Sequence, residues 1–163
     1  MRIRPTQLED LPAVMAIYDY ARLFMSAHGN ANQWINGYPS QELITSEIEA
    51  GHSFVCEEEN LGIVGTFCYI EGVDPTYLKI YDGAWLDDDP YAVIHRMATS
   101  GKVKGIGEAC FRWAMEHCDR IRVDTHQDNI PMQRLLAKLN FKRCGIIYIA
   151  NGTKRIAYQN TSL

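Results

Sequence analysis

The spacing of apolar residues along the chain alternates between a helical period and a strand-like period. Residues 11–25 carry apolar side chains three or four positions apart, which is typical of an amphipathic helix. Thr6 and Glu9 are expected to form a capping box where this helix begins. The residues that set its apolar face are Leu11, Val14, Met15, Tyr18, Leu23 and Phe24.

Three more helices are predicted from the same kind of pattern. One begins at Ser40, runs to about Ala50 and ends at Gly51. The segment before it is rich in Gly, Asn, Pro and Ser, which predicts a loop or a broken helix. The other two helices are expected at residues 105–117 and 129–139.

The remaining apolar runs are short, rich in β-branched and aromatic residues, and typical of strands. Acidic residues at 58–60 and the pair Asn151-Gly152 mark two hairpin turns. The predicted strands cover residues 2–5, 52–58, 61–70, 77–86, 91–99, 119–125, 141–150 and 154–160.

The order of these elements predicts the fold class. Most neighbouring strands are joined by short turns, whereas residues 91–125 form a strand–helix–strand unit that requires a parallel crossover. We therefore expect an α/β fold with a mixed, mostly antiparallel sheet flanked by helices. With 163 residues, the chain is expected to form one domain, residues 1–163.

Composition narrows the range of partners and compartments. The formal net charge of −4 argues against a nucleic-acid partner, and no segment is apolar enough for a membrane span or signal peptide. The five cysteines form no C-x-x-C pair, which favours reduced, buried thiols in a cytoplasmic protein. Basic residues cluster locally at Lys102 and Lys104, and a small basic patch suits a small anionic ligand.

A glycine-containing loop lies next to these lysines. Gly105 and Gly107 would let a ligand approach the backbone, and the helix that follows presents unpaired amides at its first turn. A Walker loop is excluded, and Cys110 stands where a dinucleotide fingerprint needs its third glycine. Two readings remain open on local grounds: a pyrophosphate cradle, or a tight structural turn.

The stretch K-V-K-G-I-G at residues 102–107 resembles the Q/R-x-x-G-x-G/A signature of the GNAT-type N-acetyltransferase superfamily, with Lys102 in the Arg or Gln place. Residues 128–141, DNIPMQRLLAKLNF, resemble the asparagine-led helix of that family, and the order of elements matches over nearly the whole chain. The resemblance implies direct transfer of an acetyl group from acetyl-CoA to a primary amine of a small molecule or peptide. It is also compatible with a homodimer and, alternatively, with a non-catalytic CoA-binding module.

The resemblance also implies which residues contact acetyl-CoA. Met97, Ala98 and Thr99 would pair with the pantetheine arm as an added strand, and Asn129 would touch the pantetheine or phosphate region. Leu136 stands in the usual place of a tyrosine that protonates the departing thiolate, and leucine cannot donate a proton. The pyrophosphate would be held by Lys102, Val103, Lys104, Gly105, Ile106, Gly107 and Glu108.

Catalysis by direct transfer needs a base close to the thioester. His95 is the leading candidate because it precedes Met97 by two residues and should share its face of the strand, with Arg96 pointing the opposite way. A structural, hydrogen-bonded histidine is the alternative at this position. His126 is a second candidate, and no cluster of ligands suggests a metal. Acceptor contacts are expected from Trp34, Tyr38, Tyr69, Asp82 and Trp85.

Overall fold

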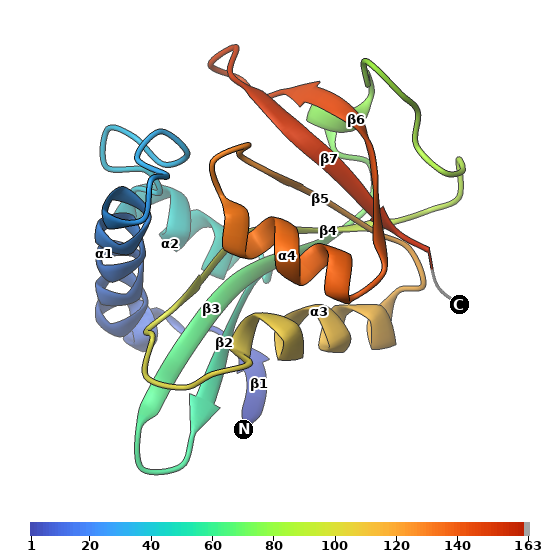
Figure 1. Ribbon diagram of the computed structural model, residues 1–163. Coiled ribbons are helices and arrows are strands. Elements are labelled where there is room, and N and C mark those ends of the chain that lie inside the picture. The colour runs from blue at the N-terminus through green and yellow to red at the C-terminus, as the bar shows by residue number, and fades with distance from the viewer. Residues whose placement is uncertain (162–163) are drawn as a thin grey trace.

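The computed structural model describes residues 1–161, which form one seven-stranded sheet with helices on both faces (Figure 1). The sheet order is β1-β2-β3-β4-β5-β7-β6, and every neighbouring pair except β4–β5 is antiparallel. The predicted fold class is confirmed. The strands are β1 (Arg2–Pro5), β2 (Ser53–Glu58), β3 (Gly62–Glu71), β4 (Ala92–Thr99), β5 (Ile121–Thr125), β6 (Phe141–Tyr148) and β7 (Lys154–Asn160).

Two pairs of helices cover the two faces of the sheet. Helices α1 (Leu11–Ala27) and α2 (Gln41–Glu49) bury Val14 and Ile44 against Val55 of β2. Helices α3 (Ile106–His117) and α4 (Ile130–Lys138) pack on the opposite face, where Phe67 and Phe111 belong to the larger core cluster. Because successive side chains of β2 and β3 point to opposite faces of the sheet, these strands contribute residues to the cores on both faces. No helix within residues 1–161 combines the length and apolar character that crossing a membrane requires.

The sheet opens where β4 and β5 run parallel. Only two residue pairs, Ala92 with Ile121 and Val93 with Arg122, join these strands. Beyond them the strands separate, so the second half of β4 pairs with β3 alone among the described residues. This separation leaves backbone hydrogen-bonding groups of β4 facing an opening.

A bulge interrupts β4 at Arg96, which has a φ of 53°. His95 pairs with Cys68 and Ala98 pairs with Thr66, so two residues of β4 stand opposite one residue of β3. The bulge changes the direction of the side chains: Met97 packs in the α3–α4 core, whereas His95 contacts Asp74 on the other side. The prediction that His95 and Met97 share a face, with Arg96 opposite, is therefore wrong.

Two predictions about α1 need correction, one about its start and one about its apolar face. Thr6 does not cap a helix, because its buried hydroxyl lies 2.8 Å from that of Ser53. A short 3-10 turn, η1 (Leu8–Asp10), precedes α1 instead, and Gln7 and Asp10 form the capping box. Within α1, Leu23 is 72% exposed and lies outside the apolar face.

Residues 77–86 do not form the expected strand. The region begins at the last residue of the 3-10 turn η2 (Pro75–Tyr77), and within the described residues its one isolated β-bridge to the sheet joins Tyr81 and Ile146. A Cβ on Gly83 would lie 1.9 Å from the carbonyl oxygen of Cys144, so the two backbones meet at one crossing point. A crossing of this kind replaces the ladder that a paired strand would form.

Candidate functional site

A cavity of about 730 Å³ lies where β4 and β5 separate. Its walls come from the loop between α1 and α2, the middle of β4, the end of β5, and the start of β7. Trp34 and Tyr38, both expected to contact the acceptor, line this cavity together with His95, Arg96 and Met97.

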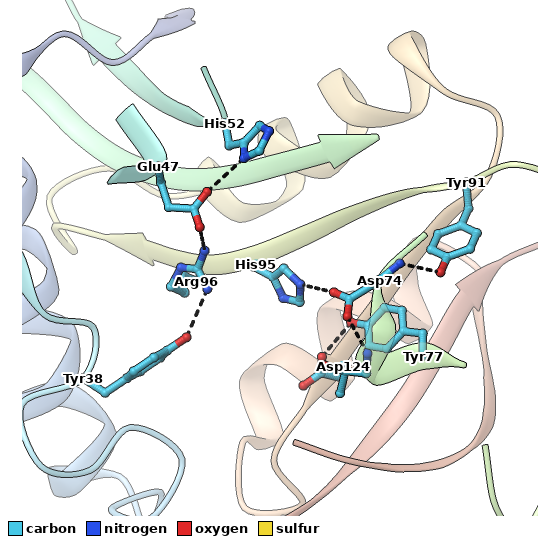
Figure 2. A network of polar contacts seen from close by, with 10 residues as sticks. Tyr38, Glu47, His52, Asp74, Tyr77, Tyr91, His95, Arg96 and Asp124 are labelled. Carbon is cyan, nitrogen blue, oxygen red and sulfur yellow. Dashed lines mark hydrogen bonds and ion pairs between the residues drawn. The ribbon is translucent and has the colours of Figure 1, made fainter. Parts of the chain in front are cut away.

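His95 and Asp74 form a hydrogen-bonded pair on the cavity wall (Figure 2). His95 Nε2 lies 2.8 Å from Asp74 Oδ2, and the other carboxylate oxygen of Asp74 accepts the amide of Thr76. Burial would raise the pKa of Asp74, but the hydrogen bond and charge of His95 and the bond from Thr76 hold this pKa below its ordinary value of 3.8. An ionised Asp74 accepts a hydrogen bond from the N–H at Nε2, so a neutral His95 keeps its lone pair on Nδ1.

A second chain of contacts in Figure 2 joins Glu47, Arg96 and Tyr38. Arg96 Nη2 lies 2.8 Å from Glu47 Oε1, and Nη1 donates to the hydroxyl of Tyr38 at 3.1 Å. The direction expected for Arg96 is not observed, because its side chain lines the same cavity as that of His95. Since Glu47 pairs with Arg96, neither charge is left uncompensated in the cavity.

A third set of polar side chains on the cavity wall includes Asp124 of β5 and Arg155 of β7. The hydroxyl of the buried Tyr77 donates to Asp124 Oδ2 at 2.6 Å, and burial followed by the charge of Asp124 raises the pKa of Tyr77 well above its ordinary value. Arg155, only 5% exposed, donates from Nη2 to the carbonyl of Gln33 and from Nη1 to that of Lys154. Both Asp124 and Arg155 line the cavity.

The glycine loop has the features of an anion site. Gly105 caps α3 with a φ of 82°, a conformation that glycine adopts without strain. The amide of Ala109 makes the first intrahelical bond, to Gly105, so the three preceding amides have no acceptor within the helix. Lys102 and Lys104 beside them are exposed. The donors and charges present therefore fit a pyrophosphate.

Gly107 has a packing role that the sequence did not indicate. A Cβ at this position would lie 2.9 Å from Leu135 Cδ2 and 3.5 Å from Met97 Sδ, so the glycine permits α3 to approach α4. The side chain of Glu108 forms ion pairs with Lys138 and Arg112, which neutralise its carboxylate near the helix start. Helix packing therefore accounts for the glycine at position 107, and the ion pairs account for the carboxylate at position 108, without any bound ligand.

The remaining residues expected to contact acetyl-CoA lie around the same opening. Met97 lines the cavity, while Ala98 and Thr99 pair with β3. Asn129 caps α4 by accepting the amide of Met132, and its side-chain amide donates to Gln33 at 2.8 Å. Asn129 thus ties α4 to the loop that closes the cavity. Val103 and Ile106 pack against the α3–α4 core.

His126 is not brought to the cavity wall. It is 7% exposed, and its Nδ1 accepts the backbone amide of Asp128 at 3.0 Å. Burial and, secondarily, the charge of Arg155 lower the pKa of His126 below its ordinary value of 6.5. A neutral, hydrogen-bonded ring in this position has a structural role in the turn between β5 and α4.

The lowered pKa of His126 predicts a pH effect on stability. Because the unfolded chain binds the proton more readily, stability is retained above pH 6.5 and falls as the pH decreases below that value toward the folded pKa. His126→Asn keeps a hydrogen-bond acceptor but cannot titrate. We expect the melting temperature of this variant to fall less than that of the wild type between roughly pH 7.5 and pH 5.5. Equal falls in the two proteins would contradict this assignment.

Three residues expected to contact the acceptor lie elsewhere. Tyr69 packs against Trp113 on the α3 side and donates to Glu71, because its position in β3 faces the other core. Trp85 stacks on Arg122, and Asp82 is exposed in the crossing segment. None of the three lines the cavity.

Sequence reasoning missed Asp74, Glu47 and Arg155 as cavity residues. Asp74 stands next to Pro75 in a turn, Glu47 looks like a solvent-facing helix residue, and Arg155 lies beside Lys154 in a hairpin strand. Only the three-dimensional closure of loops over the β4–β5 opening brings them together.

Leu136 is fully buried in the α3–α4 core. Since the side chain is apolar and enclosed, this position offers no proton to a departing group. The residue that stands there packs the helix against the sheet.

Comparisons with known proteins agree on one architecture. An acetyltransferase of the GNAT family from Streptococcus agalactiae 2603 is 30% identical, with 99% of this chain and 95% of that chain covered and a TM-score of 0.87. A putative acetyltransferase from Staphylococcus aureus Mu50 is 23% identical, covering 98% of both chains with a TM-score of 0.71. A ribosomal-protein-alanine N-acetyltransferase from Brucella melitensis is 18% identical, covering 98% of this chain and 99% of that chain with a TM-score of 0.66. Searches against family models and curated sequences find no match.

Proposed function

Because this chain belongs to the GNAT family of acetyltransferases, we propose that it transfers an acetyl group from acetyl-CoA directly to a primary amine held in the cavity. The observation that carries the proposal is the His95–Asp74 pair on the wall of the opening between β4 and β5. A titratable base beside an unpaired strand edge is the arrangement that direct transfer requires.

The opening and the glycine loop together suit an extended, phosphate-bearing thioester. Bound acetyl-CoA would supply the activated acyl group. Backbone groups of Met97–Thr99 would pair with its amide-containing arm. The first amides of α3, with Lys102 and Lys104, would take the negative charge of the phosphates.

His95 would act as the general base through Nδ1. The amine must lose a proton as it forms a bond to the acyl carbon, and Nδ1 is the ring nitrogen not bonded to Asp74. Asp74 holds the ring in this tautomer, as a positioning residue. A backbone amide at Met97 or Ala98 would polarise the acyl oxygen. Leu136 gives no proton, so the thiolate would leave unassisted at that position.

Calorimetric titration with acetyl-CoA, with NADH as the control ligand, tests the binding part of the proposal. We expect micromolar acetyl-CoA binding without an NADH response, followed by release of CoA when amines are supplied. Binding without turnover on any amine would favour the alternative, a non-catalytic CoA-binding module. Binding of NADH alone would contradict the proposal.

Asp74→Asn is expected to lower kcat by about 10²-fold while leaving the KM for acetyl-CoA unchanged. The asparagine amide can donate to Nε2 of His95, which would shift the ring proton to Nδ1 and remove the base. Asparagine retains the oxygen that accepts the Thr76 amide, so the η2 turn should persist. Steady-state kinetics of this variant should be compared with Asp88→Asn, a matched change at an exposed position. Equal kcat values in the two variants would remove Asp74 from the mechanism.

A further inference from the structure

Arg155 is a buried cation without an anionic partner. Arg4 pairs with Asp10, and Arg96 pairs with Glu47. Arg122 is as buried as Arg155 and forms no ion pair among the described residues either, but its guanidinium lies over the rings of Trp85 and Tyr91. Arg155 forms no ion pair within residues 1–161, although it is only 5% exposed.

The hydrogen bonds of Arg155 do not remove its charge. Two guanidinium nitrogens donate to backbone carbonyls, those of Gln33 at 2.9 Å and Lys154 at 3.2 Å, and these bonds fix the side chain in place. Burying a charge is costly, and burial lowers the pKa of Arg155, although the charge of Asp124 opposes this shift. The side chain lines the cavity, so an anion that enters there would supply the missing charge.

Asp124 is the complementary group on the same face of the sheet. In the β5–β7 register, Asp124 stands opposite Ala157, two residues from Arg155. Such diagonal neighbours are roughly 7–8 Å apart. The charge of Asp124 acts on Arg155 through space, but no ion pair joins the two side chains among the described residues. Asp124 also accepts the hydroxyl of Tyr77. The cavity thus holds a carboxylate and a guanidinium that are not in direct contact with each other.

We propose that the acceptor is an amino-carboxylate, whose carboxylate binds Arg155 and whose ammonium group binds Asp124 on entry. This inference rests on the proposed function and names its substrate class. The planar guanidinium matches a carboxylate with two parallel hydrogen bonds. The ring of Tyr77, whose hydroxyl bonds Asp124, lies 6.1 Å from the ring of His95, so the amine is held near the base.

The same geometry disfavours a peptide N-terminus as acceptor. A peptide replaces the carboxylate beside its terminal amine with a neutral amide. Arg155 would then remain buried without a counter-charge, and the loss of that contact lowers affinity. Arg155 and Asp124 together would therefore favour acceptors that carry both a carboxylate and an ammonium group.

Matched acceptors test this inference directly. Each common L-amino acid and its α-amide should be titrated calorimetrically into the wild type with CoA present, and assayed for acetyl transfer. The expected result is a preference for at least one acid over its amide by about 10-fold to 100-fold. No preference for any acid, or no binding of any acid, would overturn the inference.

The variant Arg155→Met should erase this preference, while Lys154→Met, at the exposed neighbouring residue, should preserve it. Arg155→Lys should keep part of the preference, since lysine retains the positive charge but cannot form the two parallel hydrogen bonds of a guanidinium. The affinity for acetyl-CoA reports whether each variant is folded. If Arg155→Met does not fold, the preference of the wild type for acids over amides is the deciding result. Arg155-dependent binding of acids without acetyl transfer would support the site and contradict the proposed function, so the two failures are distinguishable.

Discussion

Replacing His95 with alanine is expected to lower kcat by about 10²-fold, because the variant has no group on β4 to take the proton from the attacking amine. The effect should fall on kcat and not on acetyl-CoA binding, since the glycine loop and the start of α3 are unchanged. Steady-state kinetics measure kcat, and calorimetry measures the affinity for acetyl-CoA.

A second variant at the same position distinguishes a catalytic role of His95 from a structural one. His95 packs near Tyr77 and bonds to Asp74, so its removal also perturbs the wall of the cavity. His95→Gln keeps a hydrogen-bonding group of similar length and should be as inactive as His95→Ala if the base is what matters. A His95→Gln variant with the kcat of the wild type would show that another group is the base.

Replacing Gly105 with aspartate is expected to weaken acetyl-CoA binding by about 30-fold or more. The substitution places a negative charge at the N-terminus of α3, where the pyrophosphate would bind. Repulsion of like charges about 4 Å apart amounts to roughly 1 kcal/mol in water and about 4 kcal/mol near a protein surface, and an intermediate value of about 2 kcal/mol corresponds to this loss. Calorimetry with acetyl-CoA gives the affinity.

The matched control is Gly105→Asn. Both residues meet the same backbone strain at a φ of 82°, and nothing lies within 4 Å of a Cβ at this position. The two variants differ only in charge, so binding by Gly105→Asn should stay closer to that of the wild type. Equal affinities would show that no anion binds there. Gly107 is a poorer choice for this test, because its Cβ would contact Leu135.

The sequence predicted most elements because their signals are local. The 3.6-residue period of α1, the Ser40 cap of α2 and the Asn151-Gly152 turn each depend on a few neighbouring residues. The strand expected at residues 77–86 failed because those residues are held by a crossing contact with β6, which no local pattern encodes.

The site was less predictable because one bulge and three loops shape it. The positive φ of Arg96 breaks the alternation of β4, so a two-residue rule misplaced Met97 relative to His95. The partner of His95, Asp74, lies 21 residues earlier in a turn. Trp34 and Tyr38 line the cavity, whereas Tyr69 faces the α3 core.

Arg155 shows what a pattern of residue types cannot reveal. In the sequence it is one of two adjacent basic residues in a hairpin strand, with no sign that one is exposed and the other enclosed. The role we propose for it rests on burial without an ion pair among the described residues, which only the three-dimensional arrangement of the side chains shows.

The most direct test of the proposed function is acetyl transfer itself. The purified protein should be incubated with isotopically labelled acetyl-CoA and a panel of amines that includes amino acids, and the products examined by mass spectrometry. We expect a labelled N-acetyl product from at least one amine in the wild type and far less from His95→Ala. Acetyl-CoA binding without labelled product from any amine, or equal product from both proteins, would show that the proposed function is wrong.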